Sequence, residues 1–198
     1  RILSIERYGA SAPANVIYMA YSPLCHQLGF RSFNLFGEQP YYPRTAADIQ
    51  GAITFGQATG LDENELLAAR AFKGTEQLGF KIALCERDVA IYGAILFFGL
   101  FYGLTGRRLK PLHWIAWFLL AIVPIGLDGF SQLFSQLNLS FLMTLLPYRE
   151  STPTLRVLTG LMFGFGTAWF GLPYVEESMR ETRELLFKKF MVIDRTSS

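Results

Sequence analysis

The stretches that decide the fold are VAIYGAILFFGLFYGL at residues 89–104, LHWIAWFLLAIVPIGL at residues 112–127 and VLTGLMFGFGTAWFGLPYV at residues 157–175. Each approaches the roughly 20 apolar residues with which an α-helix crosses a hydrocarbon core about 30 Å thick. The 198-residue chain is only 51% hydrophobic because the part before these stretches is polar and mixed. The sequence therefore predicts an all-α, polytopic membrane helix bundle with three transmembrane helices.

Positive charge next to the spans predicts their orientation, because short loops rich in Lys and Arg stay in the cytoplasm. The loop between the first two spans holds Arg107, Arg108 and Lys110 and no acid. More cations follow the third span, at Arg180, Arg183, Lys188 and Lys189. We expect residues 1–88 to form an extracytoplasmic segment, residues 89–175 the bundle and residues 176–198 a charged cytoplasmic helix, in a bacterial cytoplasmic membrane.

The segment before the first span reads as a helical outer element of about 40 residues. Thr45 and Asp48 are spaced as a helix-capping signal. Four polar residues at 62–65 place negative charge where a second helix would start, which the helix dipole favours. A short apolar run at residues 138–146 is predicted to be re-entrant or interfacial, because it is too short to span.

Small residues recur four apart in two of the spans, and this spacing lets helix backbones approach closely. The first span carries Ala90, Ala94, Gly99 and Gly103. The third span carries Gly160, Gly164 and Ala168. These faces predict helix packing.

Cys25 and Cys85 are the only cysteines, and both fall on the predicted outer side. Three states are compatible with the pattern: a disulfide, two free thiols, or a metal site that also uses His26 and either Glu86 or Asp88. Such a donor set suits zinc. The chain has no CxxC, HExxH or CxxCH motif, and its two histidines are predicted on opposite sides of the membrane, so haem is disfavoured.

Asp128 is the most informative single polar residue, because a carboxylate beside or within a span is costly and usually finds a partner. It is placed at the outer end of the second span, where we expect a pairing with Arg87 or Arg156. Such a pair could fix helix register or form a small site for an ion, a lipid headgroup or a proton, and the alternative is a carboxylate exposed at the interface. The other polar residues expected at that end form a cluster with these three: Glu86, Asp88, Gln132, Arg149 and Glu150.

Four ordered blocks of residues resemble an uncharacterised family of prokaryotic integral membrane proteins, known as domain of unknown function 2085. The first two blocks are Cys25-His26-Gln27 with Arg31-Ser32-Phe33, and Cys85, Arg87 and Asp88 running into Ile91-Tyr92-Gly93. The later blocks are Asp128-Gly129 with Gln132, and Ser151-Thr152 with Arg156 and Thr159-Gly160. The similarity extends over most of residues 16–175.

Two features depart from the family pattern. The stretch between Gly37 and Cys85 is longer than usual, and Val89-Ala90 replaces a usual Thr-Gly pair. The resemblance also implies a fourth helix upstream of the first block. It implies an architecture and no activity.

Two functional interpretations follow. The first is a non-catalytic accessory subunit of a larger membrane complex (energy-converting, respiratory or photosynthetic), in contact with lipid and other subunits. The second is a metal- or thiol-dependent membrane protein, redox or hydrolytic, that acts through Cys25, His26, Cys85 and Asp88. A nucleic-acid partner is disfavoured because the net charge of +2 is small and dispersed.

Overall fold

The structure is a computed structural model that describes residues 12–136 and 148–197. Three helices in it are long and apolar enough to cross a membrane: Glu86–Leu104, Trp114–Gln136 and Pro153–Lys189. This confirms the all-α membrane bundle. The predicted re-entrant run at residues 138–146 lies outside the described residues.

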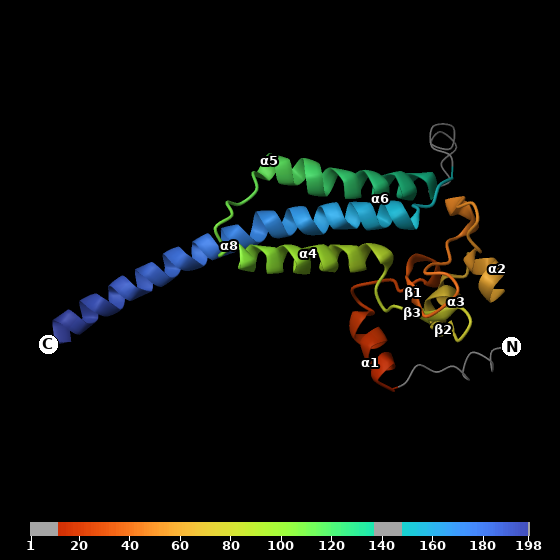
Figure 1. Cartoon of the computed structure of the whole chain (residues 1–198), viewed down its shortest axis with the longest axis horizontal. Coiled ribbons are helices and arrows are strands. Elements are labelled where there is room, and N and C mark those ends of the chain that lie inside the picture. The colour runs from red at the N-terminus through yellow and green to blue at the C-terminus, as the bar shows by residue number, and fades with distance from the viewer. Residues whose placement is uncertain (1–11, 137–147, 198) are drawn as a thin grey trace.

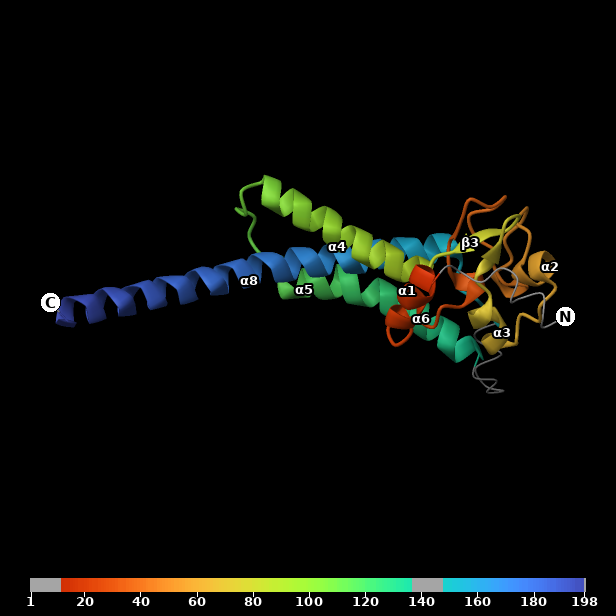
Figure 2. The same ribbon diagram turned by 90° about the horizontal axis from the view of Figure 1, so that it is seen from below.

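Helix α8, Pro153–Ser197, is the central element of the bundle. Helix α4, Glu86–Leu104, packs along one side of it. The other side is covered by a continuous helix that consists of α5 (Trp114–Trp117), a π-helical turn (Phe118–Ile122) and α6 (Val123–Gln136). Figures 1 and 2 show α8 between these two partners and running far beyond them at its C-terminal end. The third span and the charged helix are therefore one rod.

The second span is longer than its apolar run, which ended at residue 127. The helix continues to Gln136, and Asp128 is buried within it rather than beyond its end. The helix can continue past the apolar run because the Asp128 carboxylate has ionic partners and does not need water. A π-helical turn directly precedes the turn that contains Pro124, which removes one backbone donor from the helix.

Two glycines allow α8 to approach α4 closely. A Cβ atom at Gly164 would lie 2.4 Å from the carbonyl oxygen of Ile91, and one at Gly160 would lie 2.7 Å from that of Arg87. Ala90 and Ala94 face these two glycines across the contact. On the same α8, Ala168 is buried beside the aromatic rings of the bundle core.

The remaining small residues of α4 do not take part in this contact. A Cβ at Gly103 would meet nothing within 4 Å, and one at Gly99 would only touch a Leu172 methyl group at 3.8 Å. Leu96 and Leu100 beside them are 64% and 62% exposed. In a membrane protein, such a face contacts lipid or another helix.

The N-terminal segment, residues 12–85, caps the end of the bundle opposite the free end of α8 (Figure 1). Its helices are short: α1 (Ala12–Tyr21), α2 (Phe55–Thr59), α3 (Leu66–Ala71) and two 3-10 turns. It also holds an antiparallel sheet of order β1-β3-β2, formed by Asn34–Leu35, Gly79–Lys81 and Gly74–Thr75. The segment is thus less helical than its sequence suggested.

The N-terminal segment has a small core of its own. Phe30, Tyr42 and Phe55 are almost fully buried there and pack with Leu28 and Ala69. The Phe30 and Phe55 rings meet edge to face at 5.9 Å. Two parts of the segment that face the bundle lie next to this core: the stretch around residue 31 and β3, which precedes α4.

Candidate functional site

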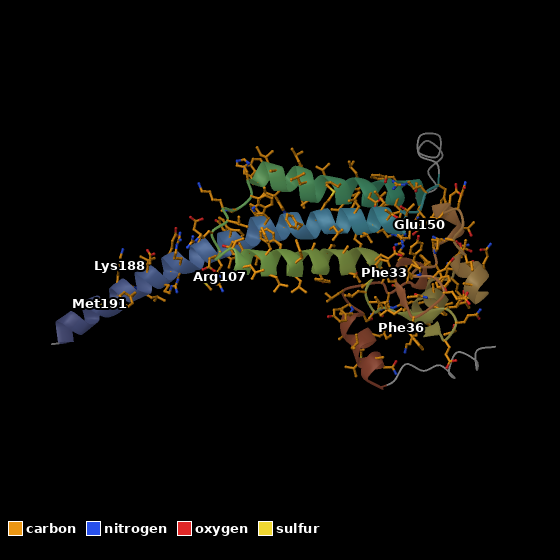
Figure 3. The ribbon with its side chains drawn as sticks, viewed as in Figure 1. Phe33, Phe36, Arg107, Glu150, Lys188 and Met191 are labelled. Carbon is orange, nitrogen blue, oxygen red and sulfur yellow. The ribbon has the colours of Figure 1, made fainter. Side chains whose placement is uncertain are left out.

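Charged side chains and two polar ones collect where the N-terminal segment meets the three spans. We call this group the ionic cluster. Its members come from every element at that end: Arg31, Arg44, Glu86, Arg87, Asp128, Gln132, Arg149, Glu150, Ser151 and Arg156. Figure 3 shows Glu150 at this junction.

Asp128 is the first centre of the ionic cluster. Its carboxylate accepts hydrogen bonds from Arg87, from Arg149 at 2.9 Å and from the Ser151 hydroxyl at 2.7 Å. The Asp128 side chain is only 2% exposed. These bonds tie α4, α6 and the start of α8 together, so a charge that would be costly in a membrane is satisfied by three donors.

Glu150 is the second centre. Arg31 and Arg44 reach its carboxylate from the N-terminal segment, at 2.8 Å and 3.2 Å, and Arg156 reaches it from α8 at 2.6 Å. The amide of Gln132 adds a hydrogen bond at 3.2 Å. The Glu150 side chain is 1% exposed, so this single carboxylate joins the N-terminal segment to two spans.

Arg156 links Glu150 to a third carboxylate. The Arg156 guanidinium pairs with Glu86 at 3.2 Å as well as with Glu150. Asp128, the other partner considered for Arg156, pairs with Arg87 and Arg149. Within the described residues, the buried atoms without a hydrogen-bond partner include Glu86 Oε1, Arg44 Nε and Arg87 Nε. The carboxylates of Asp128 and Glu150 are saturated with donors, which is the condition under which buried ion pairs hold a structure together.

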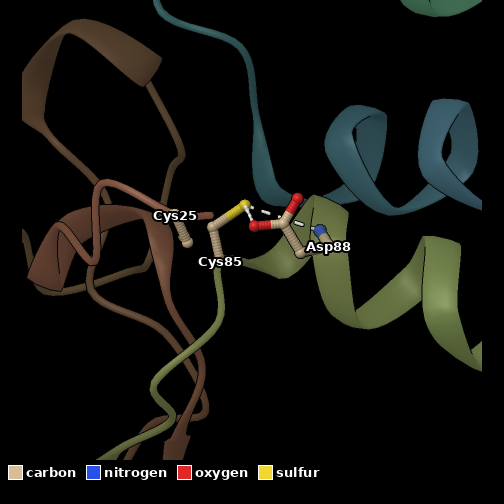
Figure 4. A group of neighbouring side chains, drawn as sticks. All are labelled: Cys25, Cys85 and Asp88. Carbon is tan, nitrogen blue, oxygen red and sulfur yellow. Dashed lines mark hydrogen bonds between the residues drawn. The ribbon is translucent and has the colours of Figure 1, made fainter. Parts of the chain in front are cut away.

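A second group lies beside the ionic cluster, and we call it the thiol site: Cys25, Cys85 and Asp88. One sulfur or carboxylate oxygen from each of these residues lies within 4.8 Å of the others. Cys85 caps the N-terminus of α4, and its Sγ lies 3.0 Å from Asp88 Oδ2. Figure 4 shows Cys85 and Asp88 facing each other at the start of α4, with Cys25 beside them.

The two thiols affect each other's protonation. The hydrogen bond with Cys85 lowers the pKa of Cys25, and burial only partly opposes it. The same hydrogen bond, together with burial, raises the pKa of Cys85. Cys25 is therefore the thiol that loses its proton first, and thiolates are the form that binds metals.

Lys81 from β3 lies behind Cys25. Its Nζ donates to the carbonyl oxygens of Gln27 at 2.7 Å and Arg70 at 2.8 Å, and the residue is 4% exposed. Burial lowers the pKa of Lys81 to about 7, an effect that the Cys25 sulfur partly opposes. Lys81 thus ties the Cys25 loop, through the Gln27 carbonyl, to the end of α3.

Two of the alternatives left open for the cysteines, a histidine ligand and a disulfide, are not found in the part of the chain that the structure describes. His26 is exposed and lies apart from the thiol site, because adjacent side chains in a non-helical stretch point to different sides and Cys25 takes the inward one. The thiols are free and not bonded as a disulfide. Asp88, which was one of two alternatives for a further donor, lies in the site, whereas Glu86 belongs to the ionic cluster.

Several partners at this end of the bundle were not predicted from the sequence. Arg31 and Arg44 were not expected in the ionic cluster, and Lys81 was not expected behind Cys25. A signal was available for Arg31, since it lies in one of the blocks that carry the family resemblance. No comparable signal marks Arg44 or Lys81, because tertiary packing alone brings them in.

Comparison with known proteins finds one relative over most of the chain and one family over its central part. An uncharacterized protein of the archaeon Methanocaldococcus jannaschii is 24% identical over 178 residues, which cover 88% of this chain and 73% of the relative. No solved structure matches the chain. Residues 73–170 match the family described as "Predicted membrane protein (DUF2085)". The matched range includes Cys85, Asp128 and Glu150, and the match confirms the resemblance that the sequence blocks predicted.

Proposed function

We propose that the protein is a metal-binding membrane protein whose ion is held at the thiol site. The observation that carries this proposal is the convergence of Cys25, Cys85 and Asp88, which the fold brings within 4.8 Å from positions 60 residues apart in sequence. Thiolate ligands favour soft or borderline metals, and a mixed sulfur and oxygen set suits Zn²⁺. The neighbouring helix N-terminus stabilises the negative charge of such ligands.

The burial of the site supports a bound ion over two exposed reactive thiols. Cys25 is 6% exposed, and Cys85 and Asp88 are half-buried. The backbone amides of Gln27 and Asp88 donate to the Cys25 and Cys85 sulfurs, each at 3.5 Å. Such bonds orient metal ligands from outside the coordination sphere.

Metal content tests the proposal. The full chain, purified in detergent without added metal, should carry stoichiometric zinc by elemental mass spectrometry. Cys25→Ser and Asp88→Asn should each reduce that content strongly. His26→Ala is the matched control, since an exposed histidine outside the site should leave the content unchanged. Equal zinc in the wild type and Cys25→Ser would contradict the proposal.

A second candidate function is an accessory subunit of a larger membrane complex. It is favoured by surfaces that nothing in the described chain covers. The α4 face around Gly99 and Gly103 is open, and the α8 extension exposes Leu185 and Phe187 by 65% and 67%. Figure 3 shows Lys188 and Met191 on that extension, away from the bundle.

Native mass spectrometry of gently extracted protein tests this second candidate. Other polypeptides bound to the 22.4 kDa chain would support it and identify the complex. A chain that leaves the membrane alone in several mild detergents would contradict it.

We further propose that the protein lies in a prokaryotic cytoplasmic membrane with the thiol site outside. The basic loop at Arg107, Arg108 and Lys110 supports this orientation. A membrane-impermeant maleimide should label a single cysteine introduced at position 36 in intact cells and should not label one at position 108. The reverse labelling would contradict the orientation.

A further inference from the structure

The thiol site supplies three ligands, which is one fewer than a tetrahedral zinc ion takes. Among the described residues, no further Cys, His, Asp or Glu joins Cys25, Cys85 and Asp88. Outside the described ranges, the sequence offers one side chain of these types, Glu6. A site of this kind has the ligand count of zinc centres that keep one position open.

Lys81 is a buried nitrogen donor that interacts electrostatically with Cys25, and two hydrogen bonds hold its amine. Its Nζ donates at 2.7 Å and 2.8 Å to two backbone carbonyls, of Gln27 and Arg70. An amine engaged in this way directs its hydrogens at those oxygens. These bonds tie the Gln27 loop to the end of α3, and the protonated amine has no lone pair for an ion. Lys81 could act as the fourth ligand only if the bound metal displaced its third proton, which a substitution at Lys81 tests.

The open side of the site is the one formed by Cys85 and Asp88. Cys25 is nearly inaccessible, whereas Cys85 and Asp88 are both half-buried. A small molecule would therefore approach over the start of α4, past the carboxylate in Figure 4.

Charge decides the class of ligand. Two thiolates and a carboxylate carry three negative charges against the two positive charges of the metal, so the loaded site is already anionic. A further anion is repelled at this distance in a half-buried site. We propose, on the basis of the metal site proposed above, that the fourth position takes a neutral exogenous donor: water at rest, replaced by an imidazole or amine group of a ligand.

This inference changes the chemistry expected of the protein. A zinc site closed by four protein ligands is structural. At a site with a bound water, a solute outside the membrane can replace that water and bind the metal directly. The proposed ligand is thus a small molecule or side chain with a neutral nitrogen donor.

Cobalt substitution tests the inference on the full chain in detergent. Co²⁺ should produce a sulfur-to-metal charge-transfer band, which reports ligation by the cysteines. Imidazole should then shift the visible d–d bands saturably while the charge-transfer band remains. Azide, as an anionic probe of similar size, should produce a shift only at much higher concentration.

Each other outcome overturns a specific step. A charge-transfer band without any response to imidazole means a closed site, and it leaves the metal proposal standing. A stronger response to azide than to imidazole contradicts the neutral ligand class. If Glu6→Gln, Lys81→Met or His26→Ala changes the spectrum before any ligand is added, the chain itself supplies the fourth ligand. The absence of a charge-transfer band overturns the metal site, and the inference with it.

Discussion

The ionic cluster and the thiol site lie side by side at the same end of the bundle, yet they differ in how their acids are satisfied. Asp128 and Glu150 each accept hydrogen bonds from three or more donors and are almost fully buried. Asp88 faces a thiol and stays half-buried. Saturated groups hold elements together, whereas groups that still have free coordination capacity can bind a ligand.

The largest effect should follow from breaking the ionic cluster. Glu150→Gln leaves Arg31, Arg44 and Arg156 without their shared carboxylate, and an uncompensated buried charge costs about 3–5 kcal/mol. Thermal unfolding in detergent should show this loss. Glu176→Gln is the control, because its pair with Arg107 is largely exposed and should contribute about 1 kcal/mol or less. Equal effects of the two changes would contradict a structural role for the cluster.

The next largest effect concerns the glycines of the spans, where one substitution should act oppositely at two positions. Gly164→Ala places a methyl group 2.4 Å from the Ile91 carbonyl and should cost about 1–3 kcal/mol by forcing α8 away from α4. A methyl group added by Gly103→Ala meets nothing within 4 Å in the described part of the chain, so this change should be neutral or slightly stabilising. The unfolding temperatures of the two variants measure this difference. Destabilisation by Gly103→Ala instead would indicate a partner on that face.

Metal removal should act on the thiol site alone. A metal present at about 100 times its Kd stabilises the folded state by about 2.7 kcal/mol, so a chelator should lower the unfolding temperature of the wild type. The same chelator should have no effect on Cys85→Ser. If it lowers the unfolding temperature of both proteins equally, the ion is bound elsewhere.

A smaller effect should appear in acid, within the N-terminal segment. Glu63 is partly buried, which raises the pKa of its carboxyl, but hydrogen bonds from the backbone amides of Thr45 and Gly56 outweigh burial and lower it. A carboxyl with a lowered pKa in the folded state stabilises above its ordinary value and loses that contribution as the pH falls through its folded value.

Amide hydrogen exchange around residue 56 should therefore accelerate as the pH falls below about 4.5, after correction for the intrinsic rate. Glu63→Gln should remove most of this dependence. An unchanged pH profile in Glu63→Gln would mean that another group is responsible.

Much of the bundle could be predicted from the sequence because hydropathy is a local property. The three apolar runs give the spans, and the four-residue spacing of Gly160 and Gly164 marks the face of α8 that lies against α4. The helix of the second span extends beyond its apolar run to Gln136, because tertiary partners satisfy Asp128 and Gln132 inside the protein, and hydropathy does not register such partners. The small sheet was missed because strands of two or three residues form only through long-range pairing.

The residues of the ionic cluster could be predicted better than those of the thiol site, because hydropathy locates only the residues that flank the spans. Residues that flank the spans had to meet near one end of the bundle, which places Asp128, Arg149 and Glu150 together. The thiol site depends on the path of a 60-residue segment, and only the structure shows that Asp88 joins the two cysteines while His26 turns away.

The most direct test of separate roles compares Asp88→Asn with the wild type, by metal content and by unfolding temperature in the presence of a chelator. We predict that Asp88→Asn loses most of its zinc while its unfolding temperature in chelator equals that of the metal-free wild type. A variant that keeps stoichiometric zinc, or one that unfolds as early as Glu150→Gln, would contradict the assignment of ligand binding to the thiol site and stability to the ionic cluster.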